Sequence, residues 1–261
     1  MTSIDELGVT AERLADLGLL PDDALAVYVS GSLVRGWGNA SSDVDVYAIT
    51  RGPWRSDSAQ LQHVALQPDV LPVQITFVEG RRWDVEYWLD TQVDQVLAKV
   101  APEVIEGDQA AGKWLTDDEL DFLDRLAYAA PVTGHDWLGE RQEQLRASAL
   151  RSVLVARALN NADLYTEDAV GQLDAGDVES AVLSVKLVFA STIDALLADA
   201  GEVAQNPKWR ARKFRRAEPP VLGFDDYWRI ETMRDFDPDD PAAWVRHVLG
   251  VCQEVTMEVA V

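Results

Sequence analysis

This sequence of 261 residues has one cysteine, three histidines and no P-loop motif. The single cysteine, Cys252, excludes an internal disulfide, and no cysteine pattern matches a metal site. The histidines stand far apart and have no Ser or Cys partner at motif spacing, so a catalytic triad is not indicated; they are His63, His135 and His247. No Gly-x-x-x-x-Gly-Lys-Ser/Thr run occurs, which excludes a P-loop enzyme.

Basic residues are outnumbered by acidic ones. The chain has 23 Lys and Arg against 45 Asp and Glu, a formal net charge of −22. Nucleic-acid binders gain most of their affinity from basic surface, so this balance disfavours a polynucleotide partner. It is compatible with a small cationic partner, such as an amine or an aminoglycoside-like sugar, although an acidic surface also serves solubility alone.

Long apolar runs are missing as well. No run of 18 apolar residues occurs, so we expect no membrane span and no membrane partner. The acidic segment MTSIDELGVTAERLADLG lacks the apolar core of a signal peptide, and we therefore expect a cytoplasmic protein. The composition is that of an ordinary globular protein, and the length allows one large domain or two small ones. Nothing in the sequence indicates an oligomeric state.

The most informative stretch is LAVYVSGSLVRGWGNASSDVDVYAI, residues 25–49. It predicts a buried strand, a Gly31-Ser32 turn and a second strand that carries Asp43 and Asp45. Alternate side chains of a strand share a face, so the two aspartates should lie side by side, about 7 Å apart. Two neighbouring carboxylates repel unless a cation lies between them, and oxygen ligands of this kind suit Mg²⁺.

The Gly-Ser turn followed by Asp-Val-Asp resembles the signature of the DNA polymerase β-like nucleotidyltransferase superfamily, in particular its small bacterial members. The resemblance extends to Arg35-Gly36 and to Ser42, and it covers only some 25 residues. It implies transfer of a nucleoside monophosphate from a nucleoside triphosphate with the help of two metal ions. It also implies that Gly31, Ser32, Arg35 and Ser42 help to hold the triphosphate and that Asp43 and Asp45 hold Mg²⁺.

A third carboxylate is implied on a later strand. WDVEYW, residues 83–88, predicts a strand on which Asp84 and Glu86 share one face. In the resembled family such a carboxylate binds the metal or acts as the base. We favour Glu86, as metal ligand and base, over Asp84, although the spacing does not settle their order and both residues are equally compatible with an exposed edge. Gln74 and Glu79 are outside candidates.

The elements indicate an α+β fold with two domains. Residues 1–100 should form a nucleotidyltransferase domain, a mixed sheet with flanking helices. Expected elements are a helix from Thr10 to Leu17, strands at 25–29, 70–78 and 83–88, and a hairpin turn at 79–81. Residues 101–261 read as helical throughout and predict a helical bundle domain. The boundary falls somewhere between residues 90 and 116.

Two features of the expected bundle are candidates for the nucleotide site. Lys186 lies in a helix that is apolar almost all round, so it should be buried and need an anionic partner such as a triphosphate; a lysine that extends to the surface is the alternative. The segment NPKWRARKFRR, residues 206–216, suggests a phosphate clamp made by Lys208, Arg210 or Arg212. The alternative is a solvated or salt-bridged basic segment. Asp194 could contact Lys186, bind a cationic substrate or be exposed.

These observations lead to a functional hypothesis. ATP or another nucleoside triphosphate is the donor, a hydroxyl or amine of a small molecule is the acceptor, and pyrophosphate leaves. Asp43, Asp45 and Glu86 would hold two Mg²⁺ ions, and Glu86 or Asp84 would activate the acceptor. The alternatives are a protein or tRNA acceptor and a non-catalytic nucleotide-binding regulator. Aspartates that lie far from any cleft, or that form ion pairs with an arginine, would contradict the metal assignment and the function that depends on it.

Overall fold

The protein divides into two compact units. A computed structural model describes residues 7–103, 115–203 and 206–259. The first unit comprises Met1–Asp108 and Trp114–Ser148, and the second comprises Gln109–Lys113 and Ala149–Val261. The first contains a mixed sheet and the second is helical in its described residues, so the predicted α+β class is confirmed.

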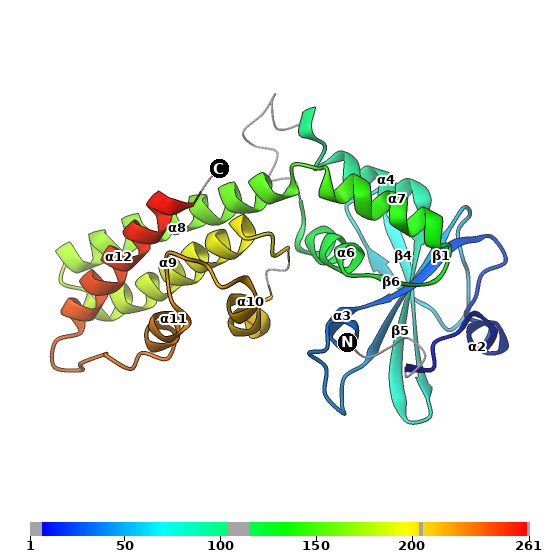
Figure 1. Cartoon of the computed structure of the whole chain (residues 1–261), viewed down its shortest axis with the longest axis horizontal. Coiled ribbons are helices and arrows are strands. Elements are labelled where there is room, and N and C mark those ends of the chain that lie inside the picture. The colour runs from blue at the N-terminus through cyan, green and yellow to red at the C-terminus, as the bar shows by residue number, and fades with distance from the viewer. Residues whose placement is uncertain (1–6, 104–114, 204–205, 260–261) are drawn as a thin grey trace. The chain divides into compact units, whose positions relative to one another are not determined.

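The first unit is built on a six-stranded sheet (Figure 1). In their order across the sheet, the strands are β3 (Gln60–His63), β4 (Val70–Val78), β5 (Arg81–Leu89), β2 (Val44–Thr50), β1 (Ala24–Ser30) and β6 (Ala130–Thr133). Strands β2 and β5 are parallel, and the other neighbouring pairs are antiparallel. The two strands that carry the predicted acids are therefore direct neighbours.

Five helices of the first unit have described bounds. They are α2 (Ala11–Asp16), α3 (Gly31–Val34), α4 (Asp90–Ala98), α6 (Asp117–Ala127) and α7 (His135–Arg146). Helix α2 matches the predicted first helix, because the Thr10 side chain caps it by accepting a hydrogen bond from the Arg13 amide. Helices α4 and α7 run close together (Figure 1), where Arg141 of α7 forms ion pairs with Asp90 and Asp94.

The sheet has one apolar face and one face that carries the acids. Val44 and Val46 are buried in a core with Val85 and with Leu14 of α2, as the alternation of β2 predicts. On the opposite face, Phe122 of α6 packs with its ring centroid 4.1 Å from that of Trp88 and 6.5 Å from that of Tyr47. Helix α6 is therefore positioned directly over the strands that carry the acids.

The prediction that the chain is helical throughout after residue 100 is wrong at β6. Residues Ala130–Thr133 pair with β1 and form an edge of the sheet. Pro131 suits an edge position because proline has no amide hydrogen to donate to a further strand. The first unit consequently extends to Ser148, beyond the expected boundary at residue 100, because α6, β6 and α7 pack with the sheet.

In the residues that the structure describes, the second unit contains three long helices and three short ones. They are α8 (Leu150–Asp174), α9 (Val178–Asp199), the 3₁₀ helix η2 (Pro207–Trp209), α10 (Arg210–Ala217), α11 (Phe224–Glu231) and α12 (Pro241–Glu258). Helix α9 packs extensively against α8 and α12. It is also the one described helix that is long and apolar enough to cross a membrane, a test that core helices of soluble proteins pass too; 61% of its most apolar window is buried.

Candidate functional site

The predicted acids gather on one face of the sheet in the first unit. Asp45 on β2 pairs in register with Ser30 on β1 and with Asp84 on β5, and Asp43 immediately precedes β2. Residues in register on neighbouring strands point to the same face, so Asp45 and Asp84 share a face with Tyr47 and Glu86, the pair two positions further along. The sequence-predicted carboxylates thus occupy one surface.

Gly31 lies directly against Asp45. Its backbone has a φ of +84°, which favours glycine. A Cβ atom at this position would lie 2.0 Å from Oδ2 of Asp45 and 2.3 Å from Nη1 of Arg125. Only a residue without a side chain leaves room for both groups. The Gly-Ser turn and the Asp-Val-Asp strand, which are separate in the sequence, therefore form a single corner.

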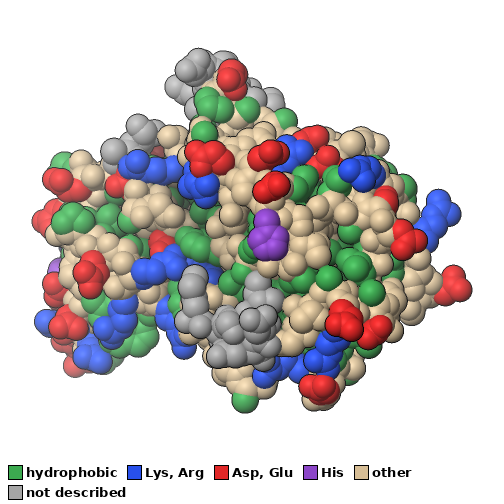
Figure 2. All heavy atoms as spheres, turned by 45° about the vertical axis from the view of Figure 1, so that its right-hand side comes forward, with side chains coloured by type: hydrophobic (Ala, Val, Ile, Leu, Met, Phe, Trp, Pro, Cys, Tyr) green, Lys and Arg blue, Asp and Glu red, His purple; other side chains and the backbone are tan. Residues whose placement is uncertain are grey.

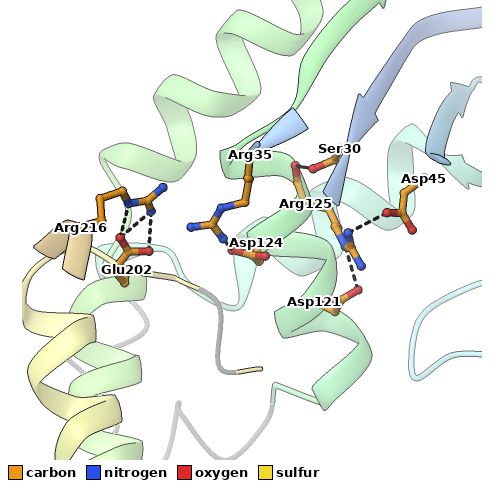
Figure 3. A network of polar contacts seen from close by, with 8 residues as sticks. All are labelled: Ser30, Arg35, Asp45, Asp121, Asp124, Arg125, Glu202 and Arg216. Atoms are coloured by element: carbon orange, nitrogen blue, oxygen red, sulfur yellow. Dashed lines mark hydrogen bonds and ion pairs between the residues drawn. The ribbon is translucent and has the colours of Figure 1, made fainter. Parts of the chain in front are cut away.

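Arg125 of α6 is part of this corner, a position that no local sequence pattern predicts. Its Nη1 donates to Oδ2 of Asp45 at 3.0 Å, and its Nε donates to Oδ2 of Asp121 at 3.2 Å (Figure 3). The backbone carbonyl of Arg125 accepts a hydrogen bond of 2.7 Å from the hydroxyl of Ser30. Asp121 and Arg125 are one helical turn apart, a spacing that suggests an ion pair but not its position over the sheet.

The environment of Asp45 disfavours a charged carboxylate. Burial raises the pKa of Asp45 to about 6; the positive charge of Arg125 opposes this rise, and the negative charges of Asp43, Asp121 and Asp84 add to it. The Arg125 guanidinium is held charged, because burial lowers its pKa but Tyr47, Asp45 and Asp121 raise it by more. One arginine therefore faces several acids, and the corner keeps a surplus of negative charge.

The two candidates for the third carboxylate have different surroundings. Both oxygens of Asp84 accept hydrogen bonds from Arg82, at 2.6 and 2.7 Å. Glu86 instead accepts one hydrogen bond of 2.9 Å from Nε1 of Trp88. Burial, the largest cause, raises the pKa of Glu86 to about 7, and the negative charges of Asp121 and Asp45 act in the same direction. A carboxylate with a pKa near 7 suits proton transfer at neutral pH, which favours Glu86 over Asp84 as the base.

The side chains as placed do not fit the predicted site for two Mg²⁺ ions. Among residues 7–103, 115–203 and 206–259, no three His, Cys, Asp or Glu side chains converge as a metal site requires. Asp45 faces Arg125, Asp84 faces Arg82 and Glu86 faces Trp88. The ion pair of Asp45 is the arrangement expected to contradict the metal assignment, because the guanidinium occupies the carboxylate oxygen that a metal would need.

The remaining predicted phosphate ligands of the first unit lie on or near α3. Arg35 lies between the rings of Trp37 and Tyr128, 3.7 and 3.9 Å from their centroids, and donates to Asp124 at 3.3 Å. Its side chain is only 5% exposed, so these contacts favour a structural role that joins α3 to the end of α6. The Ser42 hydroxyl accepts a hydrogen bond from the amide of Asn39. Ser32 is partly exposed beside Gly31.

The predicted residues of the basic segment 206–216 are occupied with neighbours in the second unit. Arg210 forms a two-bond ion pair with Asp194, both bonds 2.9 Å long, and its side chain is 9% exposed. Lys208 and Arg212 lie over the ring of Trp209, 5.3 and 5.2 Å from its centroid. These contacts agree with the salt-bridged alternative, and Asp194 is neither a partner of Lys186 nor simply exposed.

Lys186 does not have the buried environment that the sequence predicts. Within the second unit its side chain is exposed on α9, between Leu183 and Leu187, which are 67% and 47% exposed. Of the two alternatives, the exposed position agrees with a lysine that extends to the surface and not with a buried one. The requirement for an anionic partner, which rested on burial, falls with it.

A large cavity of the first unit lies away from the acids. It has a volume of about 740 Å³ and surrounds Trp54, whose ring stacks on Tyr87 with the centroids 3.6 Å apart. Thr50 at the last position of β2 lines it, whereas Asp45 lies near the start of β2. A much smaller cavity, of about 40 Å³, is lined by Glu86 and Asp121. The smaller cavity is the one associated with the candidate site.

Comparison with known proteins gives limited information. No family model matches the sequence, and no curated protein does. Among solved structures, a similar one is the nucleotidyltransferase-like protein from Exiguobacterium sibiricum 255-15, with 13% sequence identity and a TM-score of 0.49. The similarity covers 94% of this chain and 72% of that chain.

Proposed function

We propose that the protein transfers a nucleoside monophosphate from a nucleoside triphosphate, with ATP as the first donor to test, to a small-molecule hydroxyl or amine. The observation that carries the proposal is the corner in which Gly31 lies against Asp45, with no space for even a Cβ atom. Gly31 itself is buried, and the partly exposed Ser32 next to the acid-bearing strand is the part of the turn that suits phosphates and their counter-cation. The resemblance of residues 25–49 to nucleotidyltransferases supports the same function.

The protein groups have separate tasks in this proposal. The backbone of Gly31 and the hydroxyl of Ser32 would donate hydrogen bonds to the phosphates. Glu86 would take the proton of the acceptor as the acceptor oxygen or nitrogen bonds to the α-phosphorus and pyrophosphate leaves with the electrons of the broken P–O bond. The divalent cation would enter with the substrate, as the Mg²⁺ complex of the nucleotide. Catalysis would rest on positioning and on charge neutralisation.

The charge distribution supports a small, cationic acceptor. Asp43, Asp45, Asp84, Glu86 and Asp121 outnumber the basic side chains around the corner, which favours an acceptor that carries amino groups. In the face drawn in Figure 2, the Lys and Arg side chains are interspersed with Asp and Glu and do not form one continuous basic patch. This surface does not resemble the basic stripe of a nucleic-acid-binding protein.

One observation favours a second candidate, a nucleotide-binding regulator without turnover. The ion pair between Asp45 and Arg125 places a cation of the protein where a catalytic cation would be needed. If that pair persists when nucleotide is bound, the site can hold phosphates but cannot assemble for transfer. The two candidates therefore differ in whether pyrophosphate is released.

The deciding experiment is a screen of acceptors with α-labelled ATP and Mg²⁺, which measures both labelled product and pyrophosphate. Aminoglycosides, other polyamines, proteins and tRNA form the four acceptor groups. Label on an amino-sugar or amine supports the proposal, and label only on protein or tRNA overturns the choice of acceptor. Calorimetric binding of ATP with no pyrophosphate released for any acceptor would establish the regulator instead.

A further inference from the structure

The cavity of about 740 Å³ in the first unit lies on the face of the sheet opposite to the acids. Tyr87 of β5 lines it and lies between Glu86 and Trp88 in the strand, so its side chain points away from both of them. Leu61 of β3 and Pro72 of β4 pair in register and line the same cavity. A volume in this range is typical of pockets that bury a small ligand, and the candidate site does not use it.

One wall of the cavity is the segment 51–59, which follows β2. Its start is fixed because the amide of Gly52 donates a hydrogen bond of 2.7 Å to Asp23. Further along, the ring of Trp54 stacks on the buried ring of Tyr87, with an angle of 7° between the two planes. This wall is therefore packed onto the sheet and places an aromatic ring at the cavity.

The wall that contains Pro68 and Val70 is held by the side chain of Gln92 of α4. Gln92 is fully buried and donates hydrogen bonds to the carbonyls of Pro68 and Val70, at 2.8 and 3.2 Å. Its side-chain oxygen accepts a hydrogen bond of 3.0 Å from the amide of Leu89. The polar group of this wall is thus occupied within the protein, so the wall offers a ligand mainly apolar contacts. The cavity is formed without a ligand.

The lining of the cavity is mostly apolar, and three of the lining residues are prolines. Leu61 is 67% exposed on β3, a strand whose four residues are all exposed. A ligand in the cavity would cover this leucine and contact the stacked pair of Trp54 and Tyr87. Apolar and aromatic surroundings of this kind favour a flat ring over a polar chain.

Charge is confined to the outer rim of the cavity. The charged lining residues are Arg55 and Asp57, both exposed, and neither has a hydrogen-bond or ion-pair partner among the described residues. With the exposed Arg51, the segment 51–59 has two basic residues against one acidic one, in a chain with a net charge of −22. Arginine binds a carboxylate through two parallel hydrogen bonds, so the rim favours an anionic group.

We propose that this cavity binds a small aromatic carboxylate, with its ring among the apolar side chains and its carboxylate on Arg55. The inference does not rest on the proposed function, because the acids lie on the other face of the sheet. It assigns the protein a ligand site in addition to the candidate site described above.

The test is isothermal titration calorimetry of the full chain with α-naphthoate and two analogues that each change one feature. α-Naphthylmethylamine reverses the charge, and decahydronaphthoate keeps the carboxylate but loses the flat ring. We expect α-naphthoate to bind with a dissociation constant of about 0.1 mM and each analogue to bind about tenfold more weakly or worse. No binding of α-naphthoate at about 1 mM would overturn the inference. An amine that binds equally well would overturn the carboxylate, and an equally good decahydronaphthoate would overturn the aromatic ring.

Variants locate the binding site. L61W places an indole in the cavity from the exposed strand β3 and should weaken α-naphthoate binding by about tenfold or more. F77W, at an aromatic residue of β4 that is 70% exposed and does not line the cavity, is the matched control and should bind as the wild type does. D45N, on the opposite face, should also bind as the wild type does. Circular dichroism checks that each variant is folded. Equal binding by L61W and F77W, or loss of binding in D45N, would place the ligand elsewhere and overturn the inference.

A pair of arginine variants tests the carboxylate contact without affecting the core. R55Q should weaken α-naphthoate binding by about tenfold, because it removes the charged fork at the rim. R51Q removes the same charge from the same segment but from a residue that does not line the cavity, so it should change the affinity by less than about twofold. Equal effects of R55Q and R51Q would reduce the role of Arg55 to general charge and overturn its assignment as the ligand contact.

Discussion

The corner around Asp45 and the basic segment 206–216 both suggest phosphate binding in the sequence, but their charges are arranged differently in the structure. In the segment, Arg210 pairs with Asp194 and Arg216 pairs with Glu202, each through two parallel bonds. In the corner, Arg125 donates one hydrogen bond to Asp45 and another to Asp121 (Figure 3). These two arginines of the segment are each balanced by one acid, whereas the corner has excess acid.

This difference distinguishes structural ion pairs, in which both charges are satisfied, from a candidate ligand-binding site. A two-bond pair with matched charge satisfies both groups, so an added ligand gains little there. Burial, with the neighbouring acids acting in the same direction, raises the pKa of Asp45 and Glu86, which means that folding disfavours the charged form of both groups. Perturbed pKa values of this kind cluster at functional sites.

The largest expected effect comes from D45N. The amide keeps the shape of the side chain but removes the charge, so transfer should fall by about a thousandfold. The free energy of unfolding at pH 8 should rise by about 3 kcal/mol, because the pKa raised from 3.8 to about 6 shows that the charge of Asp45 disfavours the folded state, an effect that grows as pH rises between these two values. Labelled transfer and urea unfolding measure the two quantities. Unchanged turnover would contradict the assignment of Asp45 to the site.

Removing the acid that pairs with Arg210 of segment 206–216 should lower stability and leave transfer intact, the opposite of D45N. D194A leaves the guanidinium of Arg210, 9% exposed, without its two-bond partner and should lower the free energy of unfolding by about 3 kcal/mol. Transfer per folded molecule should be retained. Urea unfolding is the measurement, and a loss of transfer without a loss of stability would show that the segment binds substrate after all.

Glu86 gives an intermediate effect that depends on pH. Its pKa is raised from 4.5 to about 7, so the protonated form is favoured in the folded state, and this contribution to stability is lost as pH rises through 7. E86Q should therefore match the wild type near pH 4 and exceed its free energy of unfolding by about 3 kcal/mol at pH 8.

If Glu86 is the base, wild-type transfer should rise with pH and level off above about 7, and E86Q should lose most of the activity at every pH. A rate profile measured from pH 5 to about pH 9 tests this. A wild-type profile that is flat across pH 7 would remove Glu86 from the role of base and leave Asp84 as the candidate.

The smallest effect belongs to an ordinary surface pair. Arg146 and Glu143 are 63% and 72% exposed, so R146A should change the free energy of unfolding by about 0.3 kcal/mol and leave transfer unaltered. A loss of more than about 1 kcal/mol would show that exposure is a poor guide to the worth of ion pairs in this protein.

Local pattern was sufficient to predict the strands that carry the acids. Alternation placed Val44 and Val46 in the core and Asp43 and Asp45 on the other face, and β4 begins and ends at the predicted residues. The strand β6 was not predicted because it has only four residues, includes a proline, and is held in place by β1, about a hundred residues earlier in the chain. Pairing at such a distance leaves no local signal.

The partners of the acids could not be predicted for the same reason. Asp45 and Arg125 are 80 residues apart, and the pattern around Arg125 predicts only an amphipathic helix. The basic segment 206–216 suggested a phosphate site where the structure has ion pairs within the protein. Its run of Lys and Arg is conspicuous in an acidic chain, but composition does not reveal that Asp194 and Glu202 neutralise two of its arginines.

Helix α6 and strand β6 follow residue 100 in the chain but belong to the first unit, which determines where a fragment of this protein can end. A recombinant fragment that stops near codon 100 would end before Phe122, leaving the indole of Trp88 and the ring of Tyr47 exposed to water. Such a fragment would be expected to precipitate, whereas one that continues through codon 148 retains the complete sheet and its cover. Domain swaps and fusion proteins that use this unit should be joined after Ser148.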